Sequence, residues 1–174
     1  LSAFVPPTPL QLALAEAPEK GRAQAARPDE EFFVFKLGAL TLAVPSKLVR
    51  EVSRLAPMTP LPRTPSFLLG VVGNRGQVMP VIDLLRFLQQ GESKPVPGGR
   101  LFVGEANGLL VAFLADQVIG LRRIFVADKL PAPSSGGAAA EFLSGLVQHR
   151  ELGTVSLLDL AKVLQAARAA VVRR

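Results

Sequence analysis

The stretch Phe67–Leu88, FLLGVVGNRGQVMPVIDLLRFL, decides the fold of this chain. Apolar runs on both sides of a Gly-Asn-Arg-Gly turn predict a β-hairpin, and a short helix is expected to begin near Asp83. The same string returns near the other end of the chain as Phe142–Leu164, FLSGLVQHRELGTVSLLDLAKVL. Five positions recur at an offset of 75 and three more at an offset of 76: Phe67, Leu68, Gly70, Val72, Arg75, Asp83, Leu84 and Leu88 match Phe142, Leu143, Gly145, Val147, Arg150, Asp159, Leu160 and Leu164. Because the offset changes near the turn, we interpret the chain as two copies of one β-rich unit.

A second, weaker internal sequence similarity supports this duplication. Residues 40–49, LTLAVPSKLV, resemble residues 110–119, LVAFLADQVI, since each has an apolar strand, a polar break and a β-branched end. Each unit is therefore expected to contain a strand, a break in which Ser46 caps a helical turn in the first copy, a strand, the hairpin and a helix. No long helical crossover joins the strands, which argues against a parallel α/β fold. The pattern favours a mainly β protein built from two small barrels.

Pro- and Gly-rich stretches predict the domain boundaries. Residues 1–28 contain five prolines and are expected to form a flexible leader. The polar segment 91–99 divides the core into a first unit of about 29–96 and a second of about 97–164, between which strands are allowed to cross over. A helix is expected from Leu157 to about Ala170, and residues 165–174 form its basic end and tail.

Composition limits the classes of function. The 174 residues are 49% hydrophobic and 20% charged, which is typical of a globular protein. The longest apolar run, residues 108–115, is much shorter than the ~18 residues that span a bilayer, so direct membrane insertion is not expected. The net charge is +6, but much of the basic excess lies outside residues 29–162. A basic β-barrel module that binds nucleic acid through its tails is the alternative function.

The chain offers little catalytic chemistry. It has no cysteine and one histidine, His149, which corresponds to Asn74 in the first copy and is expected to be a turn residue. Asp83 and Asp159 are repeat-equivalent and are expected to cap helices rather than to form an acid–base pair. We therefore expect no enzyme activity, no cofactor and no metal site. Arg75, on a glycine-flanked turn, is either an exposed turn residue or an interface arginine that binds a partner carboxylate.

The segments EFFVFKLG, VREV and RTPSFLLGVVGNRGQVMPVIDL, followed in order by ADQVIGL, EFLSGL and LLDL, resemble the CheW-type coupling proteins of bacterial chemosensory systems. The resemblance extends from about Glu31 to Leu164. It implies two SH3-like five-stranded β-barrels in tandem, short helices and no catalytic activity. It also implies a cytoplasmic adaptor, recruited to receptor arrays, that couples methyl-accepting chemoreceptors to the regulatory domain of a chemotaxis-type histidine kinase. The pathway would serve chemotaxis or surface motility.

The resemblance also indicates which residues bind the partners. The arginine of the family's NLRG turn matches Arg75, and the family's VxEI segment matches VREV. The expected receptor- and kinase-binding residues are Val49, Glu51, Val52, Gly70, Asn74, Arg75 and Gly76. The turn departs from the family pattern, because Gly73 and Asn74 replace Asn and Leu. Loss of the apolar leucine is expected to change receptor affinity or selectivity.

Overall fold

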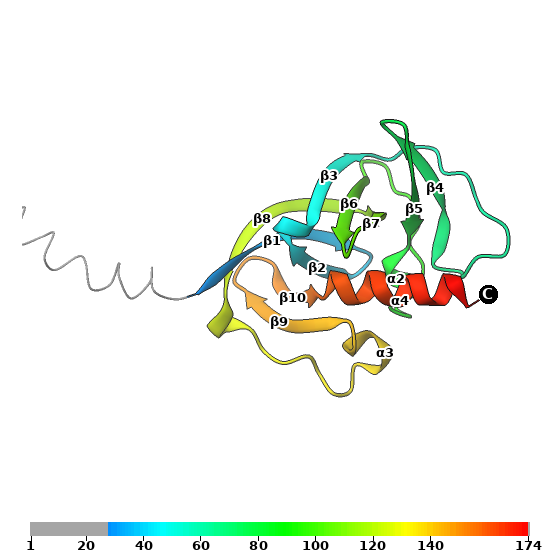
Figure 1. The fold of residues 1–174 in the computed structure, drawn as a ribbon. Helices are drawn as coiled ribbons and strands as arrows, with labels where there is room; N and C mark the ends of the chain where they lie inside the picture. The colour runs from blue at the N-terminus through cyan, green and yellow to red at the C-terminus, as the bar shows by residue number, and fades with distance from the viewer. Residues whose placement is uncertain (1–27, 174) are drawn as a thin grey trace, which may run out of the picture.

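The computed structural model describes residues 28–173, so the expected leader lies outside the described residues except for Pro28. This part of the chain folds into two five-stranded mixed sheets, short helices and a C-terminal helix (Figure 1). The elements are β1 (Asp29–Leu37), β2 (Leu40–Pro45), η1 (Ser46–Leu48), β3 (Val49–Arg54), β4 (Leu68–Asn74), β5 (Gln77–Ile82), α2 (Leu84–Phe87), β6 (Arg100–Ala106), β7 (Leu109–Ala115), β8 (Gln117–Phe125), η2 (Val126–Asp128), α3 (Gly137–Ala140), β9 (Leu143–His149), β10 (Gly153–Leu158) and α4 (Leu160–Val172). The mainly β fold class is confirmed.

The two sequence copies exchange strands. Sheet A has the order β8-β1-β2-β10-β9, and sheet B has the order β3-β6-β7-β5-β4. The boundary drawn at residues 96 and 97 therefore does not coincide with the sheets, since the first hairpin of each copy joins the last three strands of the other. The 3-10 turn η1 redirects the chain after Pro45, and β3 pairs with β6 instead of β2.

Each sheet closes on itself through one backbone bridge. The chain that leaves β3 returns to the opposite edge of sheet B, where Thr59 and Val71 exchange two backbone hydrogen bonds of 2.9 Å. The chain that leaves β8 does the same in sheet A, where Leu130 and Leu146 exchange bonds of 2.7 and 2.8 Å. Both five-stranded sheets thus become small barrels, and closure removes exposed strand edges.

The recurring glycine of the FLxG motif makes this closure possible. A β-carbon on Gly70 would lie 2.4 Å from the carbonyl oxygen of Thr59, and one on Gly145 would lie 2.7 Å from that of Leu130. Both distances are far shorter than van der Waals contact, and the atoms that would have to move belong to the bridging backbone. The motif therefore recurs because each barrel needs a residue without a side chain at its closing bridge.

We expect Gly70→Ala to lower the free energy of unfolding by about 2–3 kcal/mol, because the new methyl group must push the Thr59 backbone out of its bridge. Urea denaturation monitored by circular dichroism measures this loss. Gly73→Ala is the matched control, since it lies in the same strand and its β-carbon would meet nothing within 4 Å. Equal losses in both variants would contradict this explanation of the motif.

Phenylalanine side chains join the two barrels. Phe33 and Phe35 of β1 contact Phe102 of β6 at ring-centroid distances of 5.1 and 4.6 Å, and Phe102 stacks on Phe113 of β7 at 5.1 Å. Residues of both sheets form one continuous hydrophobic core, while a smaller cluster fills sheet A. Because β1 and β6 open the two sequence copies, the interface between the barrels is built from repeat-equivalent strands.

The helix ends confirm the expected roles of the two aspartates. Asp83 is fully buried and caps α2, and it accepts hydrogen bonds from the backbone N–H of Leu85 at 3.0 Å and of Ser93 at 2.8 Å. Asp159 caps α4 from an exposed position by accepting from the N–H of Lys162 at 3.1 Å. Helix α4 begins later than expected because Leu157 and Leu158 belong to β10. Within residues 28–173, no helix is long and apolar enough to cross a membrane.

Two other turn predictions had different outcomes. The Nδ1 atom of His149 accepts from the N–H groups of Glu151 and Leu152 at 3.2 and 3.3 Å, which confirms a turn role. Ser46 does not cap η1, because its hydroxyl donates to Glu31 at 2.8 Å and Pro45 occupies the cap position. The prediction of a Ser46 cap was therefore wrong.

Candidate partner-binding site

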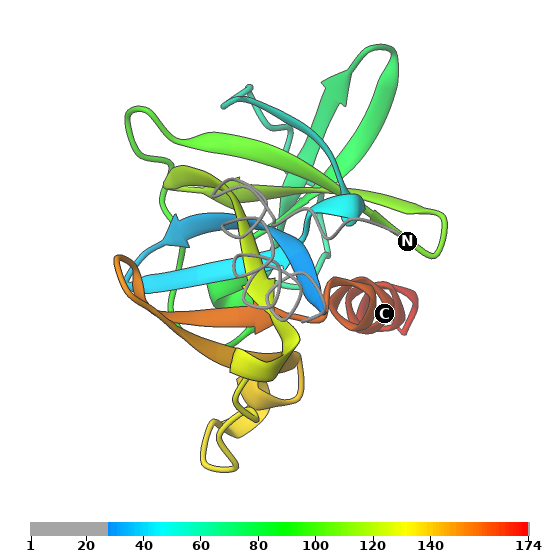
Figure 2. The same ribbon diagram turned by 90° about the vertical axis from the view of Figure 1, so that its left-hand side faces the viewer.

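The β4–β5 hairpin projects from the molecule and carries Arg75 at its tip (Figures 1 and 2). Asn74 pairs with Gln77, so Arg75 and Gly76 form a two-residue turn with φ angles of 49° and 77°. Positive φ at both positions is the requirement of a type I′ turn, which favours Asn or Gly over a long side chain. An arginine at the first position is disfavoured by the backbone, which points to a role for its side chain.

The equivalent hairpin of the second copy has a longer tip. Between His149 and Gly153 lie three residues, and only Gly153 has a positive φ, of 72°. The single inserted residue that separates the two offsets therefore lies in this turn. Arg150, the counterpart of Arg75, is exposed but is held in a different backbone conformation.

A side-chain hydrogen bond fastens the first hairpin to β3. The Nδ2 atom of Asn74 donates to Oε2 of Glu51 at 2.9 Å. The strands β3 and β4 are the two ends of the sheet B order, and this hydrogen bond joins one to the other. The asparagine that replaces the family's apolar leucine has thus gained a polar partner within the chain.

A hollow of about 260 Å³ lies beside this hydrogen bond; we call it the tip hollow. Its lining residues are Arg50, Glu51, Asn74, Arg75, Gln77, Met79, Val103, Glu105 and Leu110. Arg50 forms an ion pair with Glu105, and Glu51 accepts from Asn74. Arg75 is exposed and forms no ion pair with any residue in the range 28–173. Its guanidinium is therefore available to a partner.

A second hollow of about 430 Å³ follows the line along which the two barrels meet; we call it the seam groove. Its lining residues are Glu31, Phe33, Ser46, Lys47, Val49, Arg50, Glu51, Val52, Gly120 and Leu121. Two large apolar side chains are unusually exposed here, Val52 of β3 at 42% and Leu121 of β8 at 52%. An apolar surface framed by charged side chains is typical of a protein-binding groove.

The structure brings most of the expected site residues together. Glu51 lines both hollows, Val49 and Val52 lie in the seam groove, and Asn74 and Arg75 lie in the tip hollow. Gly76 is exposed in the turn beside them. Gly70 is different, because it is buried against Thr59 and presents no surface to a partner. Its expected place among the binding residues is corrected to a structural role in barrel closure.

Sequence reasoning missed several members of this surface, among them Arg50, Glu105 and Leu121. Arg50 lies inside the VREV segment, and its outward position follows from the alternation of exposure along β3. Glu105 and Leu121 lie on β6 and β8, so they join the site only through pairing between distant strands. No local pattern indicates such pairing.

The comparisons with known proteins agree with this geometry. Residues 31–168 match the CheW-like domain. The chain belongs to the CheW-like domain family. It is 52% identical over 159 residues to protein FrzA of Myxococcus xanthus, which covers 91% of this chain and 99% of that protein. It is 30% identical over 153 residues to chemotaxis protein CheW of Klebsiella aerogenes, which covers 82% and 86% of the two chains.

A solved structure shows the same fold. The scaffolding protein TtCheW from Thermoanaerobacter tengcongensis superimposes with a TM-score of 0.71 at 23% sequence identity, and the match covers 78% of this chain and 88% of that one. The resemblance drawn from the sequence is confirmed by the family match and by these relatives. This CheW-like protein is a non-catalytic adaptor of chemosensory signalling.

Proposed function

We propose that this CheW-like protein couples methyl-accepting chemoreceptors to the regulatory domain of a chemotaxis-type histidine kinase through two hollows that meet at Glu51. The tip hollow and the seam groove share Arg50 and Glu51, so two partners can bind side by side and influence each other. The protein works in the cytoplasm within receptor arrays, in a pathway for chemotaxis or surface motility. Val49, Glu51, Val52, Asn74, Arg75 and Gly76 form the binding surface, and Gly70 supports it from within.

The seam groove suits a receptor helix. Val52 and Leu121 offer apolar contacts from β3 and β8, and Lys47 and Arg50 stand at its edge. An amphipathic helix binds such a groove by placing its apolar face inward and its charged residues at the rim. The tip of a coiled-coil receptor provides this kind of surface.

The tip hollow suits a partner carboxylate. Within it, Arg50 pairs with Glu105 and Glu51 accepts a hydrogen bond from Asn74, so Arg75 is the cation of this lining that forms no ion pair with the described residues. A guanidinium binds a carboxylate through two parallel hydrogen bonds, and arginine is enriched among the residues that dominate interface energies. The single observation that carries the proposal is this free arginine at a strained turn position beside the seam groove.

Binding of nucleic acid through the tails is not favoured by the described residues. Proteins that bind single strands present aromatic rings on which bases stack. The phenylalanines within residues 28–173 are buried or half-buried, and several of them form the contact between the barrels.

Pull-down with the receptor's cytoplasmic domain and with the kinase tests the proposal. We expect Val52→Glu and Leu121→Glu each to weaken receptor binding about tenfold or more, because a charge replaces an apolar contact in the seam groove. Leu130→Glu is the matched control, since Leu130 is similarly exposed at 49% but lies away from both hollows. Failure of the unmodified protein to retain either partner would refute the proposed function.

A further inference from the structure

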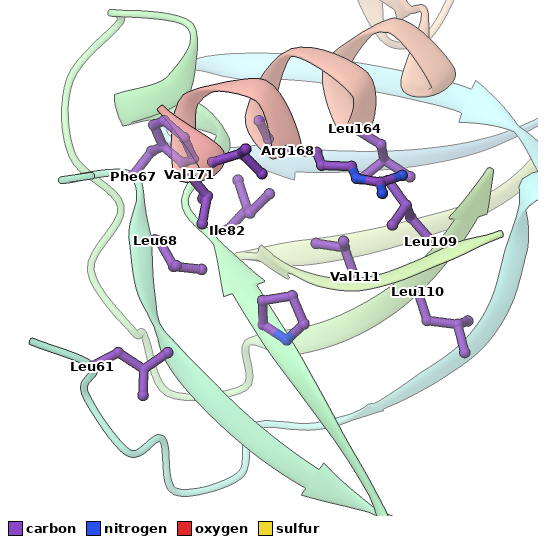
Figure 3. A pocket seen from close by; sticks show the side chains of 13 residues that line it. Leu61, Phe67, Leu68, Ile82, Leu109, Leu110, Val111, Leu164, Arg168 and Val171 are labelled. Carbon is purple, nitrogen blue, oxygen red and sulfur yellow. The ribbon is translucent and has the colours of Figure 1, made fainter. Parts of the chain in front are cut away.

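A third hollow lies between helix α4 and sheet B (Figure 3). It shares Leu110 with the tip hollow and no lining residue with the seam groove. We call it the helix groove, and its volume is about 370 Å³. Side chains from α4 and from β4, β5 and β7 point into the same space, as Leu68, Ile82 and Val171 show in Figure 3. The thirteen lining residues are Leu61, Phe67, Leu68, Pro80, Ile82, Leu109, Leu110, Val111, Leu164, Ala167, Arg168, Val171 and Val172.

The helix groove exists because α4 continues past its last buried residue. Its buried residues end at Ala167, whereas Val171 and Val172 in the next turn are 42% and 74% exposed. Leu164, Ala167 and Val171 follow the spacing of one helix face. The α4 residues that line the hollow span about two turns, roughly 12 Å, and the last of them, Val171 and Val172, are left exposed.

Charge distinguishes this hollow from the other two. Arg168 is the only charged residue in its lining, and exposed Arg173 follows as the C-cap of α4. No acidic residue occurs in the chain after Asp159. A complementary ligand is therefore apolar along its contact face and carries a carboxylate at the edge.

We propose that the helix groove binds one amphipathic helix of a partner protein, with large apolar side chains in the hollow and a glutamate or aspartate beside Arg168. A helix fits because the hollow runs along two turns of α4, from Leu164 to the exposed Val172, and helices pack on each other side by side. The partner's apolar residues are spaced i, i+3 and i+7, the pattern used in helix-in-groove recognition. Two lining residues, Val171 and Val172, lie beyond residues 31–168, which the family match covers.

Three fluorescein-labelled helical peptides test this proposal on the full chain. All three share leucines at i, i+3 and i+7, and glutamate, glutamine or lysine occupies the flanking positions. In fluorescence anisotropy we expect the glutamate peptide to bind best and Arg168→Glu to weaken it about fivefold or more, while the same variant strengthens binding of the lysine peptide. Arg150→Glu, the same charge change on the hairpin of sheet A, should leave all three affinities unchanged.

Three results would overturn the proposal. The first is that no peptide binds, and the second is that the three peptides bind equally well to the native chain and to Arg168→Glu. The third is occupation of the groove by the protein's own first residues. Because the chain has no cysteine, Leu12→Cys combined with Val172→Cys reports this directly as an intramolecular disulfide formed under mild oxidation.

Discussion

Replacing Arg75 by glutamate is expected to weaken kinase or receptor binding about 100-fold and to leave the free energy of unfolding nearly unchanged. The side chain is exposed at the tip of the β4–β5 hairpin and forms no ion pair with the described residues, so no contact that stabilises the fold is lost. Truncation of an interface arginine costs about 2 kcal/mol or more, and charge reversal adds repulsion from the partner carboxylate.

Isothermal titration with each partner measures the effect, and the duplicated fold provides its control. Arg150→Glu makes the same change at the equivalent hairpin of sheet A and should retain affinity. Arg75→Lys keeps the charge but loses the planar pair of donors, so we expect an intermediate loss. If Arg75→Glu binds both partners like the native protein, then Arg75 is only a turn residue and the tip hollow is not a binding site.

Loss of the Asp83 carboxylate should have the largest effect on stability. We expect Asp83→Ala to lower the free energy of unfolding by about 3 kcal/mol, which corresponds to a fall in Tm of about 10 °C. Asp83 is fully buried, and its oxygens accept from the N–H groups of Leu85 and Ser93 and from the Ser93 hydroxyl, while Arg86 lies 3.3 Å away. Alanine leaves these donors without an acceptor.

Differential scanning calorimetry measures this loss, and Asp159→Ala is again a repeat-equivalent control. Asp159 performs the same capping role on α4, but it is exposed and receives one backbone hydrogen bond. Loss of an exposed cap lowers the free energy of unfolding by about 1 kcal/mol, because water replaces the lost acceptor. A loss of similar size in both variants would mean that burial of Asp83 adds nothing to its capping role.

The duplication could be predicted because each hairpin is local. The turn at Arg75-Gly76, the flanking apolar strands and the caps at Asp83 and Asp159 depend on residues close together in the chain, and these appear where the pattern places them. The resemblance to the family likewise rests on short segments, from EFFVFKLG to LLDL. Local sequence therefore specified the parts of both barrels.

The assembly of those parts could not be predicted in this way. Nothing in residues 49–54 indicates that β3 pairs with β6, since that choice depends on how η1 turns the chain. The Glu51–Asn74 hydrogen bond joins residues 23 positions apart and exists only once sheet B has closed. Gly70 was assigned to the surface for the same reason, because the backbone that packs against it comes from a distant loop.

The exchange of strands between the two copies also sets the order in which the protein can be completed on the ribosome. Sheet B consists of the consecutive strands β3 to β7, so all of its pairing partners are available once Ala115 has been synthesised. Sheet A cannot close until Leu158 has emerged, because the early β1–β2 hairpin must wait for β8, β9 and β10. Until then its edges are unpaired, and unpaired strand edges are sites of intermolecular association. Sheet A is therefore completed only when β8 and β10, from the second half of the chain, pair with β1 and β2, which were synthesised first.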